Sequence, residues 1–409
     1  MQTKTLSNCP ICNSVHVDKV WELPGLPVTE RFATSGSRFT KVEQIAIDQT
    51  LSFCGRCSHG YLTNVASAEQ LYEPMGYMTA SSTSNSSLSA LKRFSGFVKQ
   101  IIEKYTVEAT NSNSILIDIG SNDSSLIQLL ESEFDRFVGI DPIPKYLVNF
   151  AKPLRLYTTL SEQFDFARIE KKGQLRVFVS SHTLEHLESP RDLFRALSNN
   201  AESTDLFVFQ FPSLDCMIES GRFFQVHNQH LHYFSISSFA RLLSEFGFEI
   251  IEYEFDRKHY GALKVAFRIT GLKVNPRFDN FPTKLTTAQL VTGIQSFRRS
   301  CILFDDIASN ARQPLTGYGA GLMYPILCYH YRTIRHLNEV IDEDPNKIGR
   351  RYLGCQADIT AIANLSDFKS VVLCTFPSEN AYTQSLSRLF SFRAERGNDF
   401  DIYLPFSLI

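Results

Sequence analysis

Hydrophobic and polar positions in the middle of the chain follow the pattern of buried strands separated by amphipathic helices. Four short apolar runs have the length of buried strands: 115–120, 136–141, 176–181 and 206–212. Helical patterns lie between them, at 124–134, 144–152 and 190–199. Short buried strands that alternate with helices predict βαβ units and a mainly parallel sheet, so the fold class is α/β.

The end of this pattern predicts a change of strand direction. A helix is expected over 235–247, with Ser235 as the N-cap candidate and Gly247 as its terminator. Two β-rich runs, 248–255 and 262–269, then follow with no helix between them. We therefore expect the parallel sheet to finish in an antiparallel hairpin.

The remaining segments predict two further units. Residues 1–75 are rich in turn formers, and a hydroxyl-rich stretch at 79–89 leads into a helix that ends near residue 105. Beyond residue 271, a long helical pattern at 286–309 precedes a strand, a glycine turn and a helix within 314–327. We predict three domains, 1–75, 76–270 and 271–409, the last a smaller α/β unit.

The composition and net charge of the chain indicate which kinds of partner it is expected to lack. The chain has 409 residues and a net charge of -2, which argues against a nucleic-acid partner because such proteins usually carry a basic face. It has no apolar run near 20 residues and no apolar stretch at its N-terminus, so we expect no membrane partner and a cytoplasmic protein. The oligomeric state stays open.

Two CxxC pairs near the N-terminus predict a metal site. Cys9, Cys12, Cys54 and Cys57 can supply four thiolates, which suits tetrahedral zinc. Four protein ligands leave no position for substrate, so this zinc would be structural. The alternatives are four unrelated thiols or a redox pair.

A second candidate site follows the first predicted strand of the middle domain. Asp118 and Gly120 end this strand, Asn122 and Asp123 open the next helix, and Asp141 ends the second strand. Glycine permits a tight turn close to a ligand, and a carboxylate at the second strand end can accept both hydroxyls of a ribose. A dinucleotide oxidoreductase remains an alternative, although the segment 180–187 looks like the post-strand segment of class I methyltransferases.

Together these motifs resemble the sugar C-methyltransferases of deoxysugar biosynthesis, over nearly the whole chain. The shared segments are the CxxC pairs, 77–82, 119–123, 227–235, 259–264, 317–321 and 342–349. The resemblance implies an N-terminal zinc domain, a class I methyltransferase core that uses S-adenosylmethionine, and a C-terminal Rossmann-like domain that holds a nucleotide-linked sugar. It also extends the cofactor site to Tyr77, Pro142, Ser181 and His182.

The segment 227–235 departs from the family where the acceptor would bind. His230 matches the family's proposed base, whereas His227, Asn228 and Gln229 replace a tyrosine, a histidine and a glutamate. Ser124 stands where the family usually has glycine. The resemblance gives catalytic roles to His230, Gln229, His227 and His186. His227 with His230 or His232 could also share a metal ion, but the segment contains no carboxylate.

The remaining candidate residues would bind the sugar nucleotide. The glycine turn at 317–321 can present backbone N–H groups to a phosphate, and Asp342 is placed like a ribose acceptor. The predicted substrate-binding residues are His232, Tyr233, His259, Lys264, Tyr318, Gly319, Asp342 and Lys347.

The expected function is methyl transfer to a nucleotide-linked ketosugar, at carbon through an enolate. The alternatives are methylation at oxygen or nitrogen, a relative that binds sugar nucleotides without methylating them, and an NAD-dependent sugar oxidoreductase.

Overall fold

The computed structural model describes most of the chain. The described ranges are 3–29, 31–33, 46–71, 85–106, 113–143, 150–171, 175–258, 261–271, 284–362, 369–375, 379–397 and 399–405. None of the helices in these ranges is long and apolar enough to cross a membrane.

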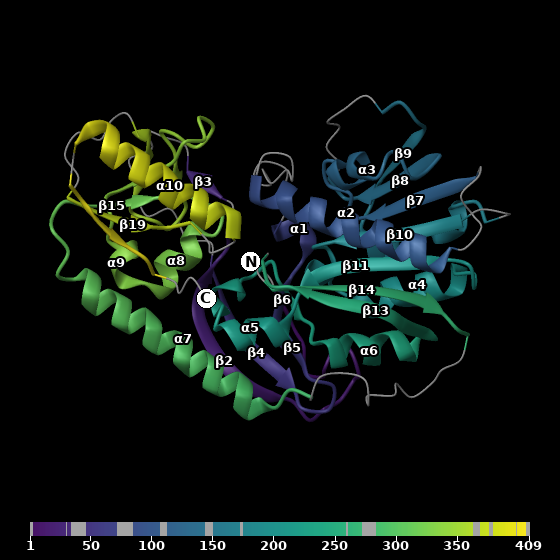
Figure 1. Cartoon of the computed structure of the whole chain (residues 1–409). Helices are drawn as coiled ribbons and strands as arrows, with labels where there is room; N and C mark the ends of the chain where they lie inside the picture. The colour runs from purple at the N-terminus through teal and green to yellow at the C-terminus, as the bar shows by residue number, and fades with distance from the viewer. Residues whose placement is uncertain are drawn as a thin grey trace.

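A seven-stranded sheet, the central sheet, forms the middle layer of the part of the molecule drawn on the right in Figure 1. Its order is β13-β14-β11-β10-β7-β8-β9, which are Phe248–Asp256, Ala262–Ile269, Leu206–Pro212, Leu175–Ser181, Ser114–Ile119, Arg136–Asp141 and Leu154–Thr158. Only β14 runs against its neighbours, because it pairs antiparallel with both β11 and β13. The predicted parallel sheet with a terminal antiparallel hairpin is confirmed.

Alternate residues of the central strands face two helical layers. Leu116 of β7 packs with α2 (Asn85–Tyr105) and α3 (Ser125–Leu129), whereas Ile115 and Ile117 pack with α4 (Pro190–Asn200) and α6 (Ile236–Glu245). This two-sided burial explains why the strands are continuous apolar runs. The fold belongs to the α/β class that the sequence predicts.

One helical prediction differs from the structure, and a second is left mostly untested. The helix predicted over 124–134 comprises only Ser125–Leu129, followed by turns. The helix predicted over 144–152 falls mostly on 144–149, outside the described residues. The helix before β7 ends at Tyr105 as expected but begins at Asn85, inside the hydroxyl-rich stretch, and α6 has Ser235 as its N-cap, as expected.

The N-terminal part is built on an antiparallel sheet in the order β12-β5-β4-β2. Three of its strands come from the first 75 residues: β2 (Asp18–Pro27), β4 (Ala46–Cys54) and β5 (His59–Leu62). The fourth, β12 (His232–Tyr233), comes from the segment that the sequence assigns to catalysis. A short pair, β1 (Thr3–Thr5) with β6 (Asn64–Ala66), and α1 (Ala68–Leu71) complete this part.

The C-terminal part has a parallel sheet of five strands. Its order is β18-β16-β15-β19-β20, which are Asp358–Thr360, Glu339–Ile341, Leu315–Tyr318, Ser370–Leu373 and Asp401–Tyr403. Its helices are α7 (Thr287–Ala308), α8 (Tyr324–His330), α9 (Arg332–Arg335) and α10 (Glu379–Arg396). The cartoon shows this part beside the central sheet, with α7 along its lower edge (Figure 1).

Contacts of the N-terminal part join all three regions of the chain. Trp21 of β2 meets Phe223 and Phe297 edge-on, so one hydrophobic cluster links the N-terminal sheet, the methyltransferase core and α7. β3 (Phe32–Ala33) also pairs with β17 (Arg351–Tyr352) of the C-terminal part. The domain limits near residues 75 and 270 stay a prediction, since packing crosses both.

Candidate functional site

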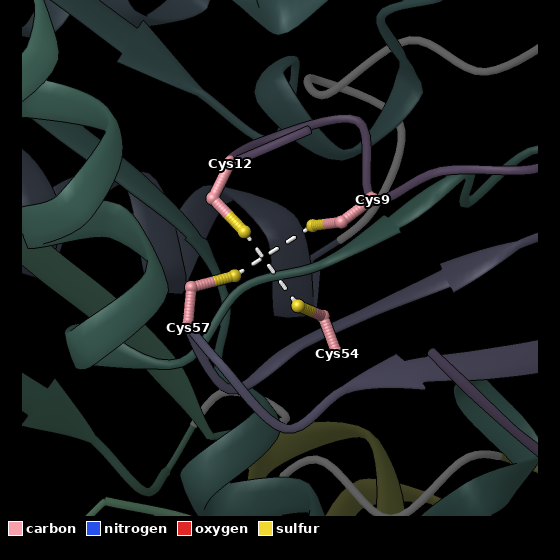
Figure 2. A group of neighbouring side chains, drawn as sticks. All are labelled: Cys9, Cys12, Cys54 and Cys57. Carbon is pink, nitrogen blue, oxygen red and sulfur yellow. Dashed lines mark hydrogen bonds between the residues drawn. The ribbon is translucent and has the colours of Figure 1, made fainter. Parts of the chain in front are cut away.

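The four predicted metal-ligating cysteines lie together. Their sulfur atoms point toward one another, with Cys9 and Cys57 at 3.6 Å and Cys12 and Cys54 at 3.6 Å (Figure 2). Sulfur atoms on a tetrahedral zinc at about 2.3 Å would be about 3.8 Å apart, whereas a disulfide needs about 2 Å. The cluster therefore has the dimensions of a zinc site and not of a disulfide.

Local backbone turns aim these thiols at one point. Cys54 ends β4, and Ser58, which donates its N–H to the Cys54 carbonyl at 2.8 Å, has a left-handed φ of 62°. Arg191 of α4 donates to the Ile11 carbonyl at 2.5 Å and pairs with Glu245 of α6. The cysteine cluster is thus fixed to the methyltransferase core.

The glycine loop after β7 makes a tight turn at Gly120 and is hydrogen-bonded to the end of β8. Gly120 has a φ of 80°, and a Cβ there would lie 1.9 Å from Thr183 Oγ1. The Asp141 carboxylate accepts hydrogen bonds from the Asn122 N–H at 2.9 Å and from the Ile143 N–H at 2.7 Å. The strand-end acid and the glycine loop therefore form one structural unit.

Asp118 is a buried carboxyl group at the end of β7. Its side chain is 2% exposed, and Oδ1 has no hydrogen-bond partner among the described residues. Burial, followed by the charges of Asp141 and Asp123, raises the pKa of Asp118 to about 8. An orphaned carboxylate oxygen beside Gly120 suits the cationic amino-acid group of S-adenosylmethionine.

Ser124, the departure from the family pattern in this loop, lies in the left-handed region. Its φ is 62° and it precedes α3. Such a conformation favours glycine because a Cβ makes it strained. The structure accommodates serine here without losing the turn.

The segment after β10 returns to the same edge of the sheet. Gln210 Nε2 donates to Ser181 Oγ at 2.7 Å, and His182 has a φ of 54°. A 3-10 turn, η4 (Leu184–His186), then brings His186 toward the segment 227–235. There the His186 Nδ1–H donates to the Gln229 carbonyl at 2.7 Å.

The segment 227–235 is held against the N-terminal part by its amide side chains. Asn228 Nδ2 donates to the carbonyls of Leu26 and Pro27 at 2.8 and 3.0 Å, and its Oδ1 accepts from Gln49 at 2.9 Å. Gln229 Nε2 donates to the Thr29 carbonyl at 3.3 Å. Two of the residues that depart from the expected pattern, Asn228 and Gln229, therefore contact β2, β4 or Thr29 just beyond β2.

The three predicted catalytic histidines lie close together at the segment 227–235. The ring centroid of His230 lies 3.9 Å from that of His227 and 4.9 Å from that of His186. Burial lowers the pKa of His227 to about 3, and burial together with His227 and His186 lowers the pKa of His230 well below its usual range. Both imidazoles are thus neutral near pH 7. His227 Nδ1–H donates to Gln229 Oε1 at 3.1 Å.

The side chains of three predicted substrate-binding residues are hydrogen-bonded or ion-paired to other residues of the protein. His232 donates through Nε2 to the Leu187 carbonyl at 2.9 Å and accepts at Nδ1 from His59 at 3.1 Å. The Tyr233 hydroxyl accepts from the His227 N–H at 3.3 Å. Lys264 is buried on β14, with Nζ 2.8 Å from Glu254. The structure does not bring Lys264 to the histidine group, and its role stays a prediction.

The glycine turn of the C-terminal part repeats the construction of the first loop. Asp342 accepts from the Ala320 N–H and the Asp344 N–H, each at 2.8 Å, as Asp141 accepts from Asn122 and Ile143. Gly319 has a φ of 92°, and Lys347 Nζ lies 3.2 Å from Asp342. Tyr318 donates its hydroxyl to Glu343 at 2.9 Å. These four predicted residues form one group.

Two of the predicted site residues lie outside the described part of the chain. Two residues that contribute to the site were not predicted from the sequence. Tyr77 and His259 lie outside the described residues, and Pro142 follows Asp141 directly. Glu185 was not predicted, although it stands next to His186 in the sequence. Gln49 was not predicted either, and the sequence carries no local signal for its contact with Asn228.

Comparisons with known proteins identify the central fold. The family described as "Methyltransferase domain" matches residues 91–253. A C-methyltransferase named NovU from Streptomyces niveus is 20% identical over 154 residues, which cover 37% of this chain and 36% of the relative. The match thus spans about a third of that relative's length.

Several solved structures of methyltransferases align with part of this chain. A S-adenosylmethionine-dependent methyltransferase from Clostridium acetobutylicum is 9% identical, with a TM-score of 0.35, and the match covers 44% of this chain and 92% of that one. For magnesium protoporphyrin IX methyltransferase from Synechocystis the identity is 13%, the TM-score 0.31 and the coverages 43% and 79%. The family match thus identifies a methyltransferase domain within residues 91–253 of this chain.

Proposed function

We propose that this protein transfers a methyl group from S-adenosylmethionine to a carbon atom of a nucleotide-linked ketosugar. The observation that carries the proposal is the gathering of His186, His227 and His230 next to the glycine loop. Thr183 joins the two, since it lies against Gly120 and its Oγ1 donates to the Ile119 carbonyl at 3.2 Å. An acceptor that contacts these histidines would be close to a cofactor held at Asp118 and Asp141.

The cofactor supplies an electrophilic methyl group on a sulfonium sulfur. Methylation at carbon also requires removal of a proton from the carbon next to the ketone. The neutral imidazole of His230 is the proposed base, and His227 is the second candidate. Gln229 would orient the sugar but cannot exchange a proton as a glutamate can.

The C-terminal part is proposed to hold the nucleotide. Its glycine turn at 317–321 can direct backbone N–H groups toward a phosphate, and Asp342 can accept ribose hydroxyls. The similarity to a protein named as a C-methyltransferase supports a carbon acceptor. The four-cysteine cluster is proposed to bind a structural zinc ion.

The experiment is methyl transfer to a panel of nucleoside-diphosphate ketosugars. We expect formation of S-adenosylhomocysteine and a product heavier by one methyl group, whose attachment to carbon or oxygen is read by NMR. His230→Gln should lose the activity, and His336→Gln, an exposed histidine of the C-terminal part, serves as the matched control. Cofactor binding without transfer to any ketosugar would reject the proposed reaction.

A further inference from the structure

We propose that Glu185, His186 and His230 form an open binding site for a divalent first-row transition-metal cation, separate from the cysteine cluster. One donor atom from each residue lies within 4.8 Å of the other two. Two imidazoles and a carboxylate are a common ligand set for such ions, and three protein ligands leave positions open for substrate or water. The carboxylate that the segment 227–235 lacks therefore comes from η4.

The backbone holds the three ligands in register. Glu185 and His186 are consecutive in η4, directly after β10. The Leu231 N–H donates to the Glu185 carbonyl at 2.8 Å, which fixes His230 opposite this turn. His186 Nε2 lies 4.0 Å from Glu185 Oε1, so only a small closure is needed for both to reach one ion.

Glu185 is a buried acidic residue in surroundings that favour a bound cation. Its side chain is 1% exposed, and Oε2 has no hydrogen-bond partner among the described residues. In the described ranges its ion-pair partners are the imidazoles of His182 and His186, with no lysine or arginine. A buried carboxylate is costly unless it is paired or coordinates a metal.

The hydrogen bonds around the site prepare His186 for coordination. Because its Nδ1–H donates to the Gln229 carbonyl, a neutral His186 presents the Nε2 lone pair. Metal-binding histidines usually make this second bond, to a carbonyl or carboxylate, and it orients the ring. His182 Nδ1 lies 3.1 Å from Glu185 Oε1 and orients the carboxylate in the same way.

The use of the ion rests on the proposed function. An open position would bind the ketone oxygen of the acceptor and stabilise the charge that develops there. When the ion is bound, His230 serves as a ligand and not as the base, so His227, the second candidate base of the proposed function, takes the proton from the adjacent carbon. The electron pair of that C–H bond forms the new bond to the methyl group, while the C–S bond breaks and its pair remains on sulfur.

Equilibrium dialysis of the full-length, zinc-loaded chain against Co²⁺ tests the site without any substrate. Cobalt and zinc are counted separately by mass spectrometry, so exchange at the cysteines would register as zinc loss. We expect one Co²⁺ per chain with zinc unchanged. Glu185→Gln and His230→Gln should each weaken Co²⁺ binding by more than about 100-fold, beyond the 10–100-fold typical for loss of an outer-shell partner.

Matched controls and a second variant separate the possible outcomes. Glu188→Gln and His336→Gln, both at exposed positions, should bind Co²⁺ like the wild type. If Glu185→Gln fails to fold, His230→Gln at its less buried position carries the test. Uptake of Co²⁺ only in exchange for zinc, or undiminished uptake by the variants, would overturn the site.

If Co²⁺ binds but no ketosugar is methylated, the metal site stands and the proposed methyl transfer fails. His227→Gln should keep Co²⁺ and lose methyl transfer.

Discussion

His186 Nδ1 donates a hydrogen bond to the backbone carbonyl of Gln229 at 2.7 Å, across 43 residues of sequence. This bond joins the turn after β10 to the segment 227–235. It brings the histidines of both segments to the carboxyl edge of the central sheet, where α/β proteins commonly bind their ligands. The candidate site is therefore assembled from two segments and not from the segment 227–235 alone.

Substitution of Gly120 should destabilise the cofactor loop. In Gly120→Ala the new Cβ would lie 1.9 Å from Thr183 Oγ1 at a φ of 80°, so the loop must shift. We expect a loss of about 1–3 kcal/mol in the free energy of unfolding, measured with urea. Gly96→Ala is the control, because nothing lies within 4 Å of its Cβ in α2, and it should stabilise by about 0.5–1 kcal/mol. Equal effects of both changes would contradict the close packing of the loop.

Removal of a cysteine ligand should remove zinc and destabilise the N-terminal part. Cys54→Ser, at the end of β4, leaves only three thiolates in the cluster, and structural zinc contributes folding energy directly. We expect the purified wild-type chain to contain one zinc per molecule and the variant to contain little zinc and to melt at lower temperature. Cys355→Ala, outside the cluster, should keep the metal. A full zinc content in Cys54→Ser would show that the cluster is not the binding site.

Asp118 should make the stability of the cofactor-free protein depend on pH. Its pKa is about 8 in the folded chain and about 4 in an unfolded one. A carboxyl with a raised pKa contributes stability that is present below pH 4 and is lost as the pH rises toward 8. Asp118→Asn carries no such charge. Urea unfolding at several pH values should show the free energy of unfolding of the variant rising relative to that of the wild type from pH 4 to 8. A difference in unfolding free energy that stays constant with pH would contradict the raised pKa of Asp118.

How much of the molecule could be predicted from sequence depends on whether the signal is local. The strands around Asp118 and Val179 are continuous apolar runs because both sheet faces are covered, and the CxxC spacing alone indicates a cysteine cluster. These features depend on residues that are close together in the sequence, and the structure confirms them.

Contacts between distant segments escaped prediction. The pairing of His232 and Tyr233 with β5 joins residues more than 170 positions apart, and no period in either segment signals it. The hydrogen bond from Gln49 to Asn228 is of the same kind. Glu185 stands beside His186 in the sequence, but its burial against the segment 227–235 exists only in the folded chain.

The acid of the C-terminal glycine turn should contribute to nucleotide binding. Asp342 organises the turn through Ala320 and Lys347, so Asp342→Asn would both loosen it and remove the ribose acceptor. Hydrogen bonds to charged groups contribute about 1.5–3 kcal/mol, which corresponds to a loss of about 10- to 100-fold in affinity. Calorimetric titration with nucleoside diphosphates measures this loss. Asp358→Asn, at an exposed position of β18, is the control, and equal affinity for Asp342→Asn would separate the turn from nucleotide binding.

Calorimetric titration of the zinc-loaded chain with S-adenosylmethionine and S-adenosylhomocysteine tests the central claim most directly. We predict one binding site per chain for both compounds, weakened by about 10- to 100-fold in Asp141→Asn, because the carboxylate holds the glycine loop and is the proposed acceptor of the ribose hydroxyls. Asp165→Asn, at an exposed turn of the same domain, should bind like the wild type. Absence of binding by the folded, zinc-loaded protein would contradict the assignment of this chain to S-adenosylmethionine-dependent methyl transfer.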